Sequence, residues 1–211
     1  MPKIKICGLK RKEDVDFVNT TKPDYIGFVF AGMKRKIDFN TAAKLSSLLD
    51  DGIQSIGVFV NDKIENIVNL CKDKTIDLIQ LHGDEDETYI NELKEKIEKP
   101  VIKAIRIPFI FTNEIRKNLA SQKICISEGT KADFMLFDSG DGGTGKVFDW
   151  NLLREYKKPF FLAGGLNKYN IEEAIKKLNP YCVDLSSGVE TDGVKDLNKI
   201  VEIIKIVRGV R

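Results

Sequence analysis

The polar and apolar positions along the chain follow two alternating spacings. Eight short apolar runs, rich in β-branched and aromatic residues, are each followed by a stretch with helical spacing of its apolar positions. The runs predict strands over residues 3–8, 24–30, 54–60, 77–83, 100–106, 132–138, 159–165 and 181–188. The stretches between and after them predict helices over residues 11–20, 39–50, 62–73, 86–98, about 113–125, 149–156, 168–178 and 196–208.

This regular alternation of strand and helix predicts a parallel sheet, because parallel strands need a crossover connection that is usually a helix. Eight such units within 211 residues fit an α/β fold, the (β/α)8 TIM barrel, as a single compact domain over residues 1–211 with few insertions. An open doubly wound sheet is the alternative. It would more naturally carry a glycine-rich phosphate loop after the first strand, but "CGLKRKED" contains no G-x-G-x-x-G.

Polar residues on the otherwise apolar strands indicate the inside of the barrel. Successive strand side chains point to opposite faces, so in "KIKICGL" the amine of Lys5 and the thiol of Cys7 share one face. By this alternation, the side chains expected to face the barrel axis are Lys5, Cys7, Gln80, His82, Lys103, Asp184 and Ser186. Barrel enzymes build their active sites at the carboxyl ends of the strands, where Cys7, His82, Asp138 and Ser186 lie.

The composition of the chain limits the classes of binding partner and the cellular compartment that we expect. The net charge is +2 and charges of both signs are interleaved, as in "NELKEKIEK", which indicates solvated helix faces rather than a nucleic-acid surface. No apolar run reaches the ~18 residues of a spanning helix and no targeting signal is found, so no membrane association is expected. Four scattered cysteines favour a reduced, cytoplasmic protein, and a single histidine argues against a zinc cluster. We expect a monomer or homodimer that binds a small molecule and no metal.

Two residues are candidates for acid–base chemistry. Cys7 shares a strand face with Lys5, whose positive charge would favour the thiolate and lower the thiol pKa; the alternative is an inert buried cysteine. Asp138 precedes the glycine-rich segment "SGDGGTGKVFDW", which suggests close backbone approach to a ligand; the alternative is a turn or capping aspartate. Asp149 is interpreted as the N-cap of the sixth helix.

Two neighbouring loops and one arginine are candidates for binding. "AGGLN" and "SSGVE" follow the last two strands, where barrels bind phosphate, although both could be simple tight turns. The expected donors are Gly164, Gly165, Ser186 and Ser187, assisted by a helix start near Gly188. Arg35 in "GMKRKIDF" could hold a substrate carboxylate, or could be an ordinary surface cation.

These segments together resemble the phosphoribosylanthranilate isomerase family, the third-step enzymes of tryptophan biosynthesis. The resemblance spans the whole chain. It rests on "KICGL", "GFVF", "GVFV", "QLHG", "VIKA", "LFDS" followed by "GGTGKVFDW", "LAGGLN" and "VDLSSGVE", in the order and spacing of the family. The segment "AGMKRKI" departs from the family, which often has proline and serine just before the arginine.

The resemblance implies a cofactor-free isomerase on a (β/α)8 barrel. It would convert N-(5-phosphoribosyl)anthranilate to 1-(2-carboxyphenylamino)-1-deoxyribulose 5-phosphate by an Amadori rearrangement. On this basis Cys7 is the general base and Asp138, kept protonated by burial, is the general acid. Arg35 corresponds to the arginine that holds the anthranilate carboxylate, and His82 and Asp184 correspond to positions near the substrate.

Two other functions remain open from the sequence. A related barrel isomerase of histidine biosynthesis performs the same rearrangement on a larger substrate with two phosphates, but it uses an aspartate on the first strand where this chain has Cys7. A phosphate-binding barrel without catalysis, acting as a sensor or scaffold, is the second. The presence of both Cys7 and Asp138 disfavours it, and an activity assay would distinguish them.

Overall fold

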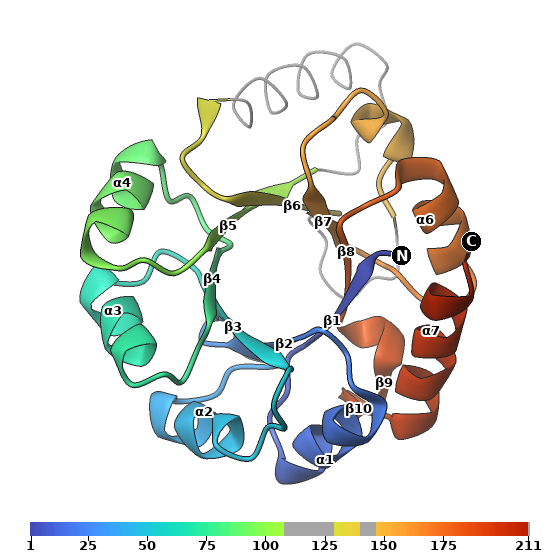
Figure 1. The fold of residues 1–211 in the computed structure, drawn as a ribbon, viewed down its shortest axis with the longest axis horizontal. Helices are drawn as coiled ribbons and strands as arrows, with labels where there is room; N and C mark the ends of the chain where they lie inside the picture. Colours follow the sequence, from blue (N-terminus) through green and yellow to red (C-terminus); the bar gives the residue numbers. More distant parts are fainter. Residues whose placement is uncertain (108–128, 140–146, 211) are drawn as a thin grey trace.

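The computed structural model describes residues 1–107, 129–139 and 147–210. Eight parallel strands form a closed barrel in sequence order, with the last strand paired to the first (Figure 1). They are β1 (Lys3–Cys7), β2 (Tyr25–Val29), β3 (Gln54–Phe59), β4 (Leu78–Leu81), β5 (Val101–Arg106), β6 (Phe134–Asp138), β7 (Phe160–Leu162) and β8 (Cys182–Leu185). The predicted barrel is therefore confirmed.

Helices surround the barrel on its outside (Figure 1). They are α1 (Lys12–Thr21), α2 (Phe39–Ser46), α3 (Ile64–Lys72), α4 (Glu87–Lys96), α6 (Ile171–Leu178) and α7 (Leu197–Gly209). The helix predicted over about 113–125 lies outside the described residues. Within the part of the chain that the structure describes, no helix has both the length and the apolar character needed to cross a membrane.

The helix predicted over 149–156 is only a short 3-10 helix, η1 (Trp150–Leu153). Asp149 does cap it, as predicted, because the Asn151 N–H donates to the Asp149 carboxylate at 3.1 Å. The segment then meets Pro159, and a residue that precedes proline avoids helical backbone. Only a short connector fits between the cap and this proline, and short connectors commonly adopt 3-10 geometry.

Two apolar layers hold the strands in place. One lies between the strands and the helices and includes Ile4, Ile6 and Val18. The other fills the barrel toward the amino ends of the strands and includes Tyr25, Ile56, Leu78, Ile102, Leu136, Phe161 and Cys182. Burial of such side chains is the main source of stability. This inner apolar layer supports the polar groups that lie toward the carboxyl ends of the strands.

The prediction that Lys103 faces the barrel axis is wrong. Its neighbours Ile102 and Ala104 belong to the inner apolar layer, so Lys103 lies on the opposite face of β5. Its ammonium contacts Glu85 at 2.8 Å and the Gly83 carbonyl at 2.9 Å. In "PVIKAIR" apolar residues occupy both alternating phases, so the pattern alone could not decide which face is inside.

A small hairpin follows β8 and lies beside the carboxyl end of the barrel. It begins with the 3-10 helix η2 (Ser187–Val189) and continues with β9 (Glu190–Thr191) and β10 (Val194–Lys195). The two strands are antiparallel, with Lys195 opposite Glu190. This hairpin places both side chains next to the candidate site.

Candidate active site

All nine predicted site residues line one cavity of about 350 Å³ at the carboxyl ends of the strands. They are Cys7, Arg35, His82, Asp138, Gly164, Gly165, Asp184, Ser186 and Ser187. They come from β1, β6 and β8 and from the loops after β2, β4, β7 and β8. The fold therefore brings these nine residues together, and their catalytic and binding roles stay predictions.

Cys7 is the last residue of β1 and is 9% exposed. Its thiol lies over Gly27 of β2, where a Cβ atom would stand only 2.7 Å from the sulfur. Burial raises the pKa of the Cys7 thiol, and the charge of Lys5 opposes this only in part. The expected net lowering of this pKa by Lys5 is therefore wrong for this structure.

Lys5 is fully buried, and its ammonium contacts other groups in preference to the thiol. Nζ donates to Oδ2 of Asp184 at 2.8 Å and to Oε1 of Gln80 at 2.5 Å. Burial alone would lower the pKa of Lys5, but the attraction of Asp184 and Cys7 raises it to about 12. The other carboxylate oxygen of Asp184, Oδ1, is buried and has no hydrogen-bond partner among the described residues.

A continuous chain of hydrogen bonds extends from Lys5 to Asp138. Since an ammonium can only donate, Oε1 of Gln80 accepts from Lys5, and the Gln80 amide group donates to Nδ1 of His82 at 2.8 Å. This hydrogen bond selects the tautomer of the His82 ring that carries its proton on Nε2, which lies 3.2 Å from Oδ2 of Asp138. Gln80 thus sets the His82 tautomer that donates to Asp138.

Asp138 ends β6 and its side chain is 17% exposed. Burial alone would raise the pKa of this carboxyl group. The hydrogen bond from His82, the Ser139 N–H and the charge of Arg106 together bring it below the usual value of 3.8. The expectation that burial keeps Asp138 protonated is therefore wrong for this structure, because these donors stabilise the carboxylate.

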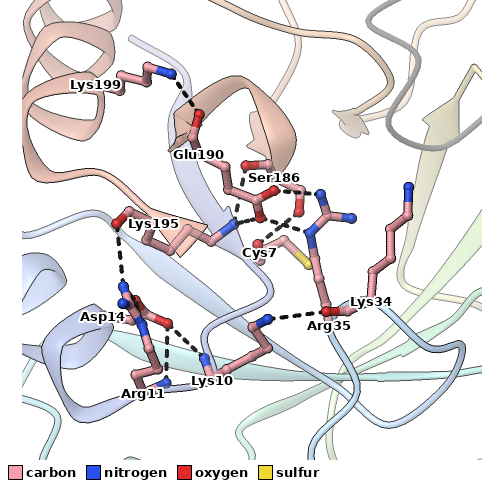
Figure 2. Close-up of polar contacts among 10 residues, drawn as sticks. All are labelled: Cys7, Lys10, Arg11, Asp14, Lys34, Arg35, Ser186, Glu190, Lys195 and Lys199. Carbon is pink, nitrogen blue, oxygen red and sulfur yellow. Dashed lines mark hydrogen bonds and ion pairs between the residues drawn. The ribbon is translucent and has the colours of Figure 1, made fainter. Parts of the chain in front are cut away.

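Arg35 follows β2 and its side chain crosses Gly8. A Cβ atom at Gly8 would stand 2.5 Å from Cδ of Arg35, and Gly8 has a φ of +89°, so glycine suits this position for two reasons. Nε and Nη2 of Arg35 donate to the two carboxylate oxygens of Glu190 at 2.8 and 2.7 Å (Figure 2). Sequence reasoning did not single out Glu190, although "SSGVE" ends with it.

The loops after β7 and β8 lie side by side at the cavity. Gly164 and Gly165 both have positive φ, 85° and 67°, and a Cβ atom at Gly164 would stand 2.3 Å from the Ser139 nitrogen. The Ser186 hydroxyl donates to the Cys7 carbonyl at 3.0 Å, which ties the end of β8 to the end of β1. The helix start expected near Gly188 is the single 3-10 turn of η2.

The family model for N-(5'-phosphoribosyl)anthranilate isomerase matches residues 4–206. The chain belongs to this family. An N-(5'-phosphoribosyl)anthranilate isomerase from Endomicrobium trichonymphae is 68% identical over 214 residues and covers 100% of both chains. Family membership confirms the resemblance noted in the sequence and makes the chain an enzyme of the isomerase class.

Solved structures of phosphoribosylanthranilate isomerases agree with the fold. The enzyme from Thermotoga maritima superposes with a TM-score of 0.84 at 34% identity, covering 99% of this chain and 100% of that one. A second phosphoribosyl anthranilate isomerase has a TM-score of 0.81 at 33% identity, with 99% and 100% covered. That protein was solved in complex with reduced 1-(o-carboxyphenylamino)-1-deoxyribulose 5-phosphate.

Proposed function

We propose that the chain converts N-(5-phosphoribosyl)anthranilate to 1-(2-carboxyphenylamino)-1-deoxyribulose 5-phosphate in tryptophan biosynthesis. The observation that carries this function is the single cavity that holds Cys7 at the end of β1 and Asp138 at the end of β6, beside Arg35 and two glycine- and serine-rich loops. An acid, a base, a carboxylate partner and a phosphate site are the groups that this substrate requires.

The reaction needs one proton donor and one proton acceptor. Asp138 in its acid form gives a proton to the furanose oxygen while the anthranilate nitrogen forms a double bond to C1, which breaks the ring C1–O bond. The Cys7 thiolate then removes the proton from C2, and these electrons form the C1–C2 double bond of an enolamine. Proton transfer from the C2 hydroxyl to C1 gives the aminoketone. C2 is oxidised and C1 is reduced within the substrate, so atoms and charge balance without an external oxidant or reductant.

The pKa directions of Cys7 and Asp138 favour protonation states that are the reverse of those the reaction uses. Burial favours the neutral thiol at Cys7, and the donors around Asp138 favour its carboxylate. The two groups together hold one proton in both arrangements, so only its position must change. The bound phosphate and carboxylate of the substrate disfavour a third negative charge at Asp138, and the cationic Schiff base stabilises the thiolate once the ring has opened.

Binding is assigned to the remaining groups of the cavity. Arg35 holds the anthranilate carboxylate, and backbone N–H groups of Gly164, Gly165 and Ser187 hold the phosphate, with Ser186 beside them. The unpartnered Oδ1 of Asp184 accepts a hydrogen bond from a ribose hydroxyl group, because a buried carboxylate oxygen without a donor is costly.

The test is a fluorescence assay that follows the loss of phosphoribosylanthranilate generated in situ. The purified chain should consume this substrate and leave the two-phosphate substrate of the histidine pathway unchanged. Turnover of the two-phosphate substrate alone would show that the substrate is wrong. Binding of the product analogue without any turnover would indicate a barrel that has lost catalysis.

A further inference from the structure

Among the residues that the structure describes, the guanidinium of Arg35 is bound along one of its two forked edges. The Nε–Nη2 edge meets the two oxygens of Glu190 at 2.8 and 2.7 Å. The outer edge, formed by Nη1 and the second proton of Nη2, is turned away from Glu190 (Figure 2). Since Arg35 lines the cavity, this outer edge is available to a second carboxylate in the same planar, two-bonded manner.

Glu190 has a second cationic partner on its other side. Nζ of Lys195 contacts Oε1 of Glu190 at 2.7 Å and the Ser186 carbonyl at 3.1 Å, and the Lys195 side chain is 1% exposed (Figure 2). Burial lowers the pKa of Lys195, while the Glu190 charge acts to keep it protonated. Burial would raise the pKa of Glu190, but Arg35 and Lys195 bring it to about 2.

The charges of these three side chains sum to one positive charge. Glu190 alone would neutralise Arg35 and weaken its attraction for an anion. Lys195 compensates Glu190, so the cluster keeps a net positive charge on the side where Arg35 meets the cavity. Lys195 also holds the carbonyl of Ser186, so the same ammonium connects this cluster to the loop assigned to phosphate.

We propose that Glu190 and Lys195 are positioning residues for Arg35: Glu190 fixes the plane of the guanidinium, and Lys195 cancels the charge of Glu190 so that Arg35 selects an aromatic substrate with an ortho carboxylate. This inference rests on the proposed function for the role of Arg35. Neither residue touches the reacting atoms. Both act through Arg35, and their effect therefore belongs to binding of the carboxylate end of the substrate.

The experiment compares two phosphorylated ligands by calorimetry. One is reduced 1-(o-carboxyphenylamino)-1-deoxyribulose 5-phosphate, and the other is the same compound without the carboxylate. Glu190→Gln keeps the shape but loses one acceptor, and Lys195→Met removes the compensating charge. Each variant should weaken binding of the carboxylated ligand by about tenfold, the effect of one charge-assisted contact, and leave the other ligand nearly unaffected.

Double variants separate positioning from general damage. In an Arg35→Ala background, Glu190→Gln should add no further loss, because the residue acts only through Arg35. Glu190→Gln with Lys195→Met should lose less affinity for the carboxylated ligand than the product of the two single losses, because the double variant leaves neither Glu190 nor Lys195 as an unpaired charge beside Arg35. A loss equal to or larger than that product would overturn the charge argument.

A matched control lies on α7, the helix that follows the hairpin. Nζ of Lys199 donates to the Glu190 carbonyl at 2.6 Å and so anchors the hairpin without touching the Glu190 carboxylate. Lys199→Met should lower the melting temperature without a selective loss of the carboxylated ligand. An equal selective loss in Lys199→Met would mean that hairpin placement alone is responsible. If Arg35→Ala itself shows no selectivity, the proposed function of Arg35 fails instead.

Discussion

Nε2 of His82 lies 3.2 Å from Oδ2 of Asp138, and the amide of Gln80 fixes the ring so that this nitrogen carries the proton. The hydrogen bond stabilises the Asp138 carboxylate and contributes to its lowered pKa. Asp138 is the proposed general acid, but the hydrogen bond from His82 favours its deprotonated form. A change at His82 should thus move the proton affinity of Asp138 directly.

Replacement of His82 by Phe should raise the pKa of Asp138. In the wild type this pKa lies below 3.8, and the variant loses the hydrogen bond from His82 that lowers it while burial still acts to raise it. Titration by carbon NMR of labelled aspartate carboxyl groups, with Asp138→Asn to assign the signal, measures the shift. An unchanged or lower pKa in the variant would show that His82 does not stabilise the carboxylate.

Loss of either proton-transfer group should nearly abolish turnover. Cys7→Ser replaces the base with a hydroxyl of much higher pKa, and Asp138→Asn replaces the acid with an amide that cannot donate a proton effectively. We expect kcat to fall by roughly 10²- to 10⁴-fold in each variant, with the melting temperature and circular dichroism spectrum close to wild type. Turnover near the wild-type level would remove that residue from the mechanism.

The pH profile of kcat/KM should remain level from about pH 7 to about 9. Burial raises the pKa of Cys7 above 9.0, and the pKa of Asp138 lies below 3.8, so the pair holds a single proton throughout this window. At higher pH the pair loses this proton and the acid function disappears. The substrate phosphate titrates near pH ~6, which confines the measurement to higher pH. A decline centred near pH 7.5 would contradict a raised Cys7 pKa.

Arg35→Ala should mainly raise KM, because the anthranilate carboxylate takes no part in bond making. The charge-assisted, two-bonded contact is worth roughly 10- to 100-fold in kcat/KM. Arg35→Lys should recover only part of this loss, because a point charge does not reproduce the fork. Lys34→Ala serves as the control, since Lys34 also lines the cavity. A larger loss in Lys34→Ala than in Arg35→Ala would assign the carboxylate to the lysine.

Inorganic phosphate or sulfate should inhibit competitively with the substrate. Backbone N–H groups beside Gly164, Gly165 and Ser187 can bind an anion without a lysine. A crystal soaked in sulfate should show the ion between the loops after β7 and β8. Gly164→Ala is the matched variant, because its Cβ atom would meet Ser139 and its positive φ disfavours alanine. An anion bound instead at the loop after β1 would contradict this site.

Alternation along the strands was sufficient to predict the barrel and most of the cavity. Cys7 and Asp138 end their strands, His82 directly follows β4, and all three line the cavity. The prediction for Lys103 was wrong because β5 has apolar residues in both alternating phases. Only the packing of Ile102 and Ala104 inside the barrel shows which face of β5 points inward. The expected monomer or homodimer stays a prediction.

The sequence could not predict which side chains contact each other in the site, because these contacts join residues that are far apart in the chain. Arg35 and Glu190 are 155 residues apart in the chain, and only the packed fold shows that they meet. The directions in which the pKa values of Cys7 and Asp138 are shifted likewise depend on which groups contact each side chain in the fold. Lys5 shares its face with Cys7 as predicted, but its ammonium is held by Asp184 and Gln80.

The pairing of β1 with β8 closes the barrel, so the active site can form only late in synthesis of the chain. Cys7 leaves the ribosome well before Ser186, because the Ser186 hydroxyl that donates to its carbonyl is 179 residues further along the chain. The hairpin that carries Glu190 and Lys195 emerges later still. Contacts of such long sequence separation form only after a large loop has closed. A nascent chain that stops before β8 therefore carries the proposed base but not the surroundings in which it works.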